Sequence, residues 1–382
     1  MWNQSVQRGE GSLAKLRDLL DERGSKRVFL VTGTRSYQET GLGERVERFL
    51  QGLTVERFSG FPVNPKLESA LDGAARLQAF DPDIVVAIGG GSVLDTAKLC
   101  RSLPPDHRRA TAILGGRGSV GASPVPMIAV PTTAGSGSEA THFAVVYSGG
   151  RKYSLAAPQM LPESVILDPD LTRTADRYLT IVTAWDALAQ AIESFWSRGA
   201  TEESRAYATN ALTACVTVIP RLYVHRDDEA RREMMYAAHD AGRAINISKT
   251  TAAHAMSYAF TTHWGVAHGH AVALTLGEFF RFHAELLHDS GDRDLAPAFG
   301  KTMERLARIF GVSEVSSAAE RLCELLQSSG IPLDPRDLGI PDRETLVAAT
   351  REVNTERLHN HPVSLNQEDL ETILNRIWSR QQ

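Results

Sequence analysis

Four residues in the second half of the chain have types and spacing that suit a divalent metal ion. Asp186 and Gln190 lie four residues apart in WDALAQAIES, so a helix here would present both on one face. His254 lies in TTAAHAMSYAF and His268 in VAHGHAVALTL. A carboxylate with imidazoles is a ligand set for iron or zinc. A single His or Gln is more often a hydrogen-bonded structural residue, so only the combination indicates a metal site.

Two glycine-rich stretches in the first half resemble phosphate-binding loops. AIGGGSVLDTAK (87–98) puts three glycines between a predicted strand and a predicted helix, where backbone N–H groups and a helix N-terminus attract anions. AVPTTAGSGSEAT (129–141) adds hydroxyl groups. We expect one dinucleotide along both loops, although the first could be only a tight turn, because it matches neither GxGxxG nor a Walker loop.

The candidate cofactor ligands in these loops are Gly89, Gly90, Gly91, Ser92, Asp95, Thr132, Thr133, Ser136 and Ser138. Asn64 and Lys152 are two further candidates. Ser92 could also cap the following helix, and Asp95 with Lys98 could instead be a pair on the helix surface.

Composition favours a globular protein with a small ligand. A chain of 382 residues with 42% hydrophobic residues can form two domains. The net charge of −5 argues against nucleic acid or an anionic membrane as a partner. The three cysteines are scattered, and no stretch approaches 18 uninterrupted apolar residues, so we expect a cytoplasmic protein without a membrane anchor.

The elements that position these residues fall into two domains. Residues 1–177 alternate apolar runs with amphipathic segments, which predicts an α/β dinucleotide-binding domain whose ligands bind at the carboxyl ends of parallel strands. Residues 178–382 predict an all-α domain for metal and substrate. The predicted strands are 27–33, 53–59, 83–91, 109–114 and 125–133. The predicted helices of the second domain are 179–197, 202–222, 227–245, 250–261, 268–285, 295–311, 315–328, a short one at 343–351, and 366–380.

Four motifs, GGGSVLDTAK, PTTAGSGSE, DALAQAIES and AHAMSY with AHGHAV, together resemble the iron-dependent (group III) alcohol dehydrogenase family, which has the dehydroquinate synthase-like fold. The resemblance runs from about residue 25 to residue 285. It implies an NAD(P)-dependent alcohol dehydrogenase or aldehyde reductase, and a homodimer. It also implies a metal held by one Asp and three His, matched by Asp186, His254 and His268. Gln190 replaces the remaining histidine; as a weaker donor it should lower metal affinity, broaden the choice of metal, or accompany loss of the metal.

The same resemblance assigns candidate roles in catalysis. Asp186, His254 and His268 would hold the metal that polarises a carbonyl group. Tyr258 stands where the family often has a further histidine, and a phenol there could donate a proton or only pack. Tyr258 and His270 are the candidate relays for the proton that the alkoxide receives after hydride transfer.

The end of the first long strand, VTGTRSY, bears on the choice of cofactor. Family members that prefer NAD commonly have an Asp after the Val-Thr pair, where this chain has Gly33. Without that carboxylate a 2′-phosphate would be tolerated, and Thr34, Arg35 and Ser36 could bind it. We favour NADP(H), with an ordinary surface loop as the alternative.

The stretch RAINISKTTAAHAMSY (243–258) bears on the substrate. Arg243, Asn246 and Lys249 place donors and positive charge before a predicted helix, in the manner of an anion site. Helix caps with a solvated lysine are the alternative. With Gln190, this stretch resembles the phosphonoacetaldehyde reductase branch, which implies reduction of a small anionic aldehyde, phosphonoacetaldehyde, to 2-hydroxyethylphosphonate. The other candidates are phosphonopyruvate reduction, a generic short-chain alcohol dehydrogenase, and a dehydroquinate synthase-type lyase.

Overall fold

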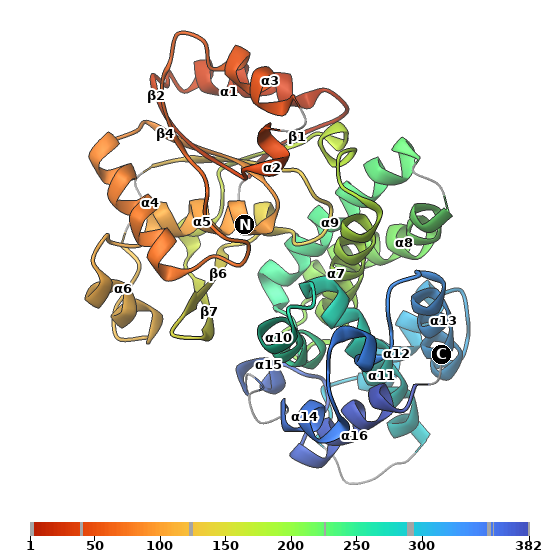
Figure 1. Ribbon diagram of the computed structural model, residues 1–382. Helices are drawn as coiled ribbons and strands as arrows, with labels where there is room; N and C mark the ends of the chain where they lie inside the picture. Colours follow the sequence, from red (N-terminus) through yellow and green to blue (C-terminus); the bar gives the residue numbers. More distant parts are fainter. Residues whose placement is uncertain are drawn as a thin grey trace. The chain divides into compact units, whose positions relative to one another are not determined.

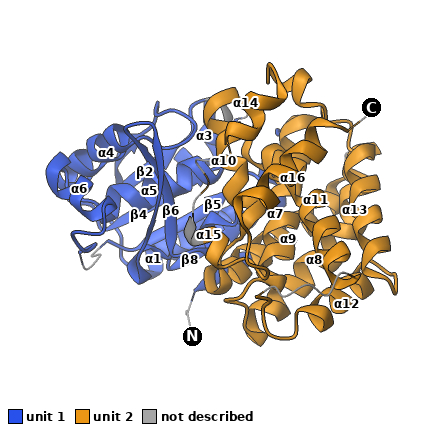
Figure 2. Cartoon of the chain, turned by 90° about the horizontal axis from the view of Figure 1, so that it is seen from below, with its two compact units in different colours: residues 1–175 blue, residues 176–382 orange. Residues whose placement is uncertain are grey.

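The computed structural model describes residues 4–38, 41–121, 125–224, 227–288, 294–349, 353 and 355–380, without the side chains at positions 35, 36, 355 and 356. The chain divides into two units, Met1–Ala175 and Asp176–Gln382 (Figure 2). The domain boundary predicted from the sequence, between residues 177 and 178, falls two residues further along the chain.

The first unit is built on a six-stranded parallel sheet with the order β1-β8-β5-β4-β2-β3. Its strands are β1 (Ser5–Arg8), β2 (Arg27–Thr32), β3 (Thr54–Phe58), β4 (Ile84–Gly89), β5 (Met127–Pro131) and β8 (Ser164–Leu167). Every residue of β4, β5 and β8 is buried. Strands buried on both faces show no apolar–polar alternation, which is why they read as continuous apolar runs in the sequence.

Helices cover both faces of this sheet (Figure 1). On one face lie α1 (Lys15–Glu22) and α3 (Leu42–Phe49), whose apolar side chains pack with those of β2, β4, β5 and β8. Towards the other lie α4 (Leu67–Phe80) and α5 (Gly91–Ser102), together with the antiparallel hairpin β6 (Phe143–Ser148) and β7 (Arg151–Ala156). The predicted α/β architecture is therefore confirmed. The short helix α2 (Arg35–Gln38) completes the elements between β2 and β3.

One predicted strand is wrong. Residues 109–114 lie in helix α6 (His107–Leu114), not in a strand. The Asp106 side chain accepts a hydrogen bond from the Arg109 backbone N–H and so caps the helix. The short strands β1 and β8 and the hairpin β6–β7 are elements that the sequence patterns did not predict.

The strand order creates a switch point between β2 and β4. From β2 the chain continues to β3 on one side, and then returns to β4 on the other side of β2. Gly33 follows β2 and Gly90 follows β4, so both lie at the carboxyl ends of adjacent parallel strands. Ligands of open α/β sheets bind at such a point.

The second unit is all-helical among its described residues, apart from an isolated bridge between Leu295 and Val363. Helix α7 (Arg177–Trp196) contacts α8 (Glu202–Val224), α9 (Asp228–Ser248) and α11 (His268–His288), and α10 (Ala252–Trp264) packs on α11 (Figure 1). The remaining helices are α12 (Phe299–Ile309), α13 (Val315–Ser328), α14 (Arg343–Ala348), α15 (Thr355–His359) and α16 (Gln367–Trp378). The predicted all-α second domain is confirmed. In the part of the chain that the structure describes, no helix is long and apolar enough to cross a membrane.

Helix α7 has no solvent face along its second half. All residues from Ala184 to Trp196 are buried, including Asp186, Gln190, Glu193 and Ser194. A helix buried all round is normally apolar all round. Buried polar side chains need hydrogen-bond or ionic partners. These four residues therefore indicate a polar site in the interior of the second unit.

Candidate active site

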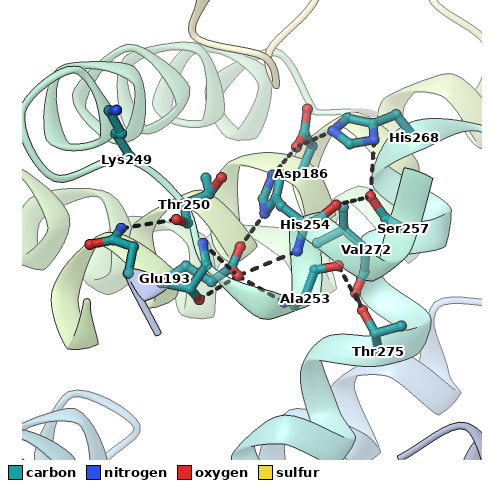
Figure 3. Close-up of polar contacts among 12 residues, drawn as sticks. Asp186, Glu193, Lys249, Thr250, Ala253, His254, Ser257, His268, Val272 and Thr275 are labelled. Carbon is teal, nitrogen blue, oxygen red and sulfur yellow. Dashed lines mark hydrogen bonds and ion pairs between the residues drawn. The ribbon is translucent and has the colours of Figure 1, made fainter. Parts of the chain in front are cut away.

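Three helices of the second unit bring together Asp186, His254 and His268 (Figure 3). Each residue offers one ligand atom, and these atoms lie within 4.8 Å of one another. The Asp186 carboxylate Oδ1 is 3.2 Å from His254 Nε2 and 4.0 Å from His268 Nε2. Asp186 and His254 are buried, whereas the His268 side chain is 33% exposed. Three converging ligands with one accessible side fit a divalent metal that keeps an open coordination position.

Glu193 orients His254, and the sequence analysis did not identify it. One carboxylate oxygen, Oε2, hydrogen-bonds to His254 Nδ1. The other, Oε1, accepts from the backbone N–H groups of Thr251 and Ala253, each at 3.0 Å, and from the Thr251 hydroxyl at 2.6 Å. The proton on Nδ1 is thereby fixed and Nε2 is turned towards Asp186 (Figure 3). A signal was present in the sequence, because Glu193 lies seven residues after Asp186 and so on the same face of α7.

Ser257 joins the two histidine ligands. Its hydroxyl donates to the His254 carbonyl oxygen at 2.7 Å and lies 3.4 Å from His268 Nδ1 (Figure 3). The two histidine rings meet edge to face, with centroids 5.3 Å apart. Ser257 is fully buried, so this contact leaves His268 Nε2 as the nitrogen that faces Asp186.

Gly269 allows α11 to approach α7 closely. A Cβ atom at this position would lie 1.9 Å from the Val182 carbonyl oxygen and 3.0 Å from the Asp186 Cβ. Because backbone cannot yield to such a clash, only glycine fits here. The glycine between His268 and His270 therefore sets the spacing between the ligands on α7 and α11.

Gln190 lies one turn after Asp186 and is buried. Its side chain hydrogen-bonds to the Asp186 carboxylate and helps to lower the pKa of that group. An amide must donate through its nitrogen to a carboxylate. In this structure Gln190 therefore supports Asp186, and whether its oxygen also binds the metal remains a prediction.

The charges of the cluster act on one another. Burial alone would raise the pKa of Asp186, but the hydrogen bond from His254, the charges of both histidines and the contact with Gln190 lower it below its usual range. Burial likewise opposes the charged form of His254, but Glu193 and Asp186 raise its pKa to about 9. Asp186 is thus an ionised ligand, and His254 must lose its Nε2 proton when it binds a metal.

Tyr258 lies beside the cluster, as its candidate role requires. Its ring stacks on that of His268, with centroids 6.0 Å apart. Burial raises the pKa of Tyr258, while the buried Arg357, which hydrogen-bonds to it, acts in the opposite direction. The phenol therefore keeps its proton at neutral pH.

Both ring nitrogens of His270 have hydrogen-bond partners outside the Asp186–His254–His268 cluster, which argues against its predicted role as a relay. Its Nε2 donates to the Pro332 carbonyl oxygen at 2.7 Å, so its Nδ1 accepts from the Tyr178 hydroxyl at 3.0 Å. The side chain is buried, and burial lowers its pKa. Both ring nitrogens are thus engaged in helix packing.

The two glycine-rich loops lie side by side in the first unit, as predicted for neighbouring strands. Gly89 at the end of β4 pairs with Pro131 of β5, and the Thr132 N–H donates to the Gly89 carbonyl oxygen at 3.0 Å. Cβ atoms would lie 3.3 Å from the Thr133 hydroxyl if added at Gly90 and 2.7 Å from that of Ser136 if added at Gly91. The first loop therefore needs glycines to fit against the second, as well as to approach a ligand.

Ser92 does not cap the helix that follows the first loop. Gly90 is the N-cap of α5, and the Ser92 hydroxyl instead accepts from the Asn64 backbone N–H at 3.3 Å. Asn64 has a left-handed backbone, φ 65°, and its contact brings a third loop against the glycines. Burial raises the pKa of Asp95 above its usual range, and the charges of Lys98 and of Lys152, which lies on β7, act against this increase.

Asp95 and Ser138 take part in a hydrogen-bond network within the first unit, and their predicted contact with the cofactor stays a prediction. The Ser138 hydroxyl donates to one Asp95 oxygen, and the other accepts from the Val145 N–H at 2.9 Å. The fully buried Lys98 donates to the carbonyl and hydroxyl oxygens of Ser138 and Thr141. These side chains tie the second loop to α5, so Lys98 is not a surface residue either. The candidates Arg35 and Ser36 lie outside the described side chains.

The predicted anion site before α10 is only partly supported. The backbone N–H groups at the start of α10 already bind Glu193, so they do not form an open cradle. The Arg243 guanidinium stacks on the Tyr207 ring at 3.8 Å and donates to its hydroxyl. Asn246 is buried in α9, while Lys249 is exposed in the turn between α9 and α10.

Lys249 has an unusual backbone conformation, with φ 60° and ψ 177°. This region is almost exclusive to glycine, and other residues adopt it at a cost of about 1–3 kcal/mol, most often at functional sites. Of the three predicted substrate ligands, Lys249 is thus the one with an exposed side chain and a strained backbone conformation.

A sheet with paired glycine-rich loops and a three-ligand cluster on packed helices are the features of a metal-dependent dehydrogenase that uses a dinucleotide. The family profile "Iron-containing alcohol dehydrogenase" matches residues 3–169, and "Fe-containing alcohol dehydrogenase family, C-terminal" matches residues 180–378. The chain belongs to the iron-containing alcohol dehydrogenase family. It is therefore an oxidoreductase with NAD(P)-dependent aldehyde or alcohol reductase activity, for which the family implies a divalent metal. This excludes the lyase alternative.

Three known proteins illustrate the similarity. The chain is 35% identical over 324 residues to phosphonoacetaldehyde reductase of Streptomyces viridochromogenes, covering 82% of this chain and 80% of the relative. The structure of sulfoacetaldehyde reductase from Bifidobacterium kashiwanohense in complex with NAD+ is 26% identical, with a TM-score of 0.88 and coverage of 100% and 98%. The iron-containing alcohol dehydrogenase from Thermococcus thioreducens is 26% identical, with a TM-score of 0.86 and coverage of 99% of both chains.

Proposed function

We propose that the protein reduces a small aldehyde that carries an anionic group, with phosphonoacetaldehyde as the leading substrate and 2-hydroxyethylphosphonate as the product. The observation that carries the proposal is Lys249, an exposed cation in the turn that leads into α10, the helix of His254. Two of the similar proteins are named for aldehydes with a phosphonate or a sulfonate group, and this supports the same substrate class here.

Each residue of the site has a role in this proposal. A bound divalent metal would polarise the carbonyl group, and the nicotinamide would supply the hydride. Asp186, His254 and His268 would hold the metal, while Glu193 keeps the Nδ1 proton of His254 in place. Tyr258 holds a proton on its phenol oxygen beside His268 and is the donor for the product alkoxide. Lys249 binds the anionic group and orients the aldehyde.

We further propose that NADP(H) is preferred over NAD(H). Gly33 follows β2 at the switch point of the sheet, so no carboxylate stands there to repel a 2′-phosphate. A comparison of kcat/KM with NADPH and NADH tests this preference. Equal values, or a higher value with NADH, would contradict it.

The substrate is tested by the rate of NADPH oxidation with metal-replete protein. We expect phosphonoacetaldehyde to be used with a higher kcat/KM than either propanal, which has no anionic group, or phosphonopyruvate, which has an additional carboxylate. Product analysis should give 2-hydroxyethylphosphonate in amounts equal to the NADPH consumed. Turnover of propanal alone would favour a generic short-chain alcohol dehydrogenase, and a preference for phosphonopyruvate would favour a keto acid reductase.

A further inference from the structure

We infer that Asn360 is a positioning residue for anionic substrates, because it holds Lys249 in the backbone conformation that directs the lysine side chain. The inference rests on the proposed function, in which Lys249 binds the anionic group of the aldehyde. Asn360 lies in the segment that follows α15, far from Lys249 in the sequence.

The backbone at Lys249 would suit glycine better than lysine. With φ 60° and ψ 177°, it lies in a region where a Cβ atom is strained. Its neighbours Ser248 and Thr250 are buried, so the turn cannot relieve this strain by moving out into solvent. A lysine at such a position is consistent with a requirement for its side chain there.

Asn360 binds the carbonyl oxygens of the two residues that flank Lys249. Its side-chain nitrogen Nδ2 donates to the Ser248 carbonyl oxygen at 2.8 Å and to the Thr250 carbonyl oxygen at 3.0 Å. Its oxygen Oδ1 accepts from the Gly199 N–H at 3.0 Å. Because a carbonyl can only accept and an N–H can only donate, these three partners determine the orientation of the amide.

The turn is also tied to the helix that carries Asp186. The Ser248 hydroxyl contacts the Ser194 hydroxyl of α7 at 2.7 Å, and Thr251 binds Glu193 of the same helix. Just beyond α7, a Cβ atom at Gly199 would lie 3.1 Å from Asn360 Oδ1 and 3.2 Å from the Ser248 carbonyl oxygen. Lys249 and Thr250 therefore stand in a turn that is braced against α7 (Figure 3). These contacts hold the backbone of the turn against the helix that carries Asp186.

The test uses Asn360→Ala, Lys249→Gly and the double variant, with Asn366→Ala as a matched control, since Asn366 caps α16. Each is assayed as metal-replete protein for KM and kcat with phosphonoacetaldehyde and with propanal, and for Tm. Asn360→Ala should raise KM for phosphonoacetaldehyde roughly tenfold relative to propanal, with a smaller change in kcat. Asn366→Ala should lower Tm without changing that ratio.

The melting temperatures test the mechanical link independently of any substrate. Lys249→Gly should raise Tm by roughly 2–4 °C, because glycine adopts the backbone without strain. Asn360→Ala should lower Tm less in the Lys249→Gly background than in the wild type. In that background it should also leave the ratio of KM for phosphonoacetaldehyde to KM for propanal unchanged.

The outcomes separate the inference from the proposed function. An unchanged KM ratio in Asn360→Ala, or strictly additive Tm changes, would overturn the role of Asn360 even if Lys249→Gly loses its preference for the phosphonate. If Lys249→Gly keeps the wild-type preference, Lys249 does not bind the anion, and both the inference and that part of the proposed function fall.

Discussion

Glu193 holds His254 at two points, binding the ring nitrogen Nδ1 with one carboxylate oxygen and the start of α10 with the other. One buried carboxylate thus fixes both the direction of a metal ligand and the end of the helix that carries it. Hydrogen bonds of this kind are typically worth 10- to 100-fold in metal affinity.

Glu193→Gln should therefore weaken metal binding by roughly 10- to 100-fold and lower Tm, because an amide accepts only at its single oxygen, and its nitrogen cannot accept the second set of hydrogen bonds. The dissociation constant for Zn²⁺, measured by competition with a chromophoric chelator, checks this. Glu285→Gln is the control, since Glu285 forms an exposed pair with Arg376. Equal metal affinity in Glu193→Gln and the control would contradict the assigned role.

Gly269→Ala should separate α11 from α7. A methyl group there meets the Val182 carbonyl oxygen and the Asp186 side chain, so we expect a loss of about 1–3 kcal/mol in unfolding free energy together with weaker metal binding. Chemical denaturation and the Zn²⁺ competition assay measure the two effects.

The control for this change is Gly300→Ala in α12, where the nearest atom to an added Cβ is 3.7 Å away. Alanine should fit there and stabilise the helix by up to about 1 kcal/mol. If the two alanine variants behave alike, close contact between α7 and α11 does not shape the site.

Metal affinity should increase with pH up to about 9. Glu193 and Asp186 raise the pKa of His254 to about 9 in the metal-free protein, so a metal must displace the Nε2 proton below that pH. We expect the apparent dissociation constant for Zn²⁺ to fall roughly tenfold per pH unit between about pH 6 and pH 8. Calorimetry in buffers of different ionisation enthalpy should detect the released proton. A dissociation constant independent of pH would show that His254 is already neutral.

Stability should decrease as the pH falls below about 6.5. His283 and His361 are fully buried, with their Nε2 atoms 2.9 Å apart. Burial lowers the pKa of His283 from 6.5 to about 3 and that of His361 well below 6.5. The unfolded chain therefore binds protons before the folded one, which favours unfolding by about 1.4 kcal/mol per pH unit for each proton.

Urea denaturation between about pH 5 and pH 7 measures this dependence while carboxylates stay ionised. His283→Leu should reduce the slope, and His107→Gln, at an exposed position, should not. The same slope in all three proteins would mean that the buried pair does not control acid stability.

The sequence predicted site residues well where a possible metal ligand lies within a single recognisable helical motif. Asp186, His254 and His268 each lie in a distinct helical motif, and the structure brings them together. Glu193 was missed because a carboxylate in a helix of a globular protein usually lies on the solvent-exposed face. Only the burial of the whole second half of α7 shows that it needs partners.

The errors in the first unit have similar causes. The stretch 109–114 is apolar enough for a strand, but the hydrogen bond that the Asp106 side chain accepts at the N-terminus stabilises a helix. β1 and β8 have only four residues each, too few for a period to appear. Asp95 and Ser138 have the chemistry of cofactor ligands, and only the structure shows that they also bind Val145 and Lys98.

The conformation of Lys249 could not be predicted from local sequence. Its positive φ depends on Asn360, which is distant in the chain and has no motif of its own. The stretch around Lys249 predicted three anion ligands, and of these Arg243 is engaged with Tyr207 and Asn246 is buried in α9.

We propose above all that this reductase recognises an anionic aldehyde through Lys249, in the turn that leads into the helix of the metal ligand His254. The most direct test is the ratio of kcat/KM for phosphonoacetaldehyde to that for propanal, with NADPH, in wild-type protein and in Lys249→Ala. We expect a ratio well above one in the wild type and a fall of roughly tenfold or more in the variant, with propanal turnover unchanged. A ratio near one in the wild type, or the same ratio in both proteins, would contradict it.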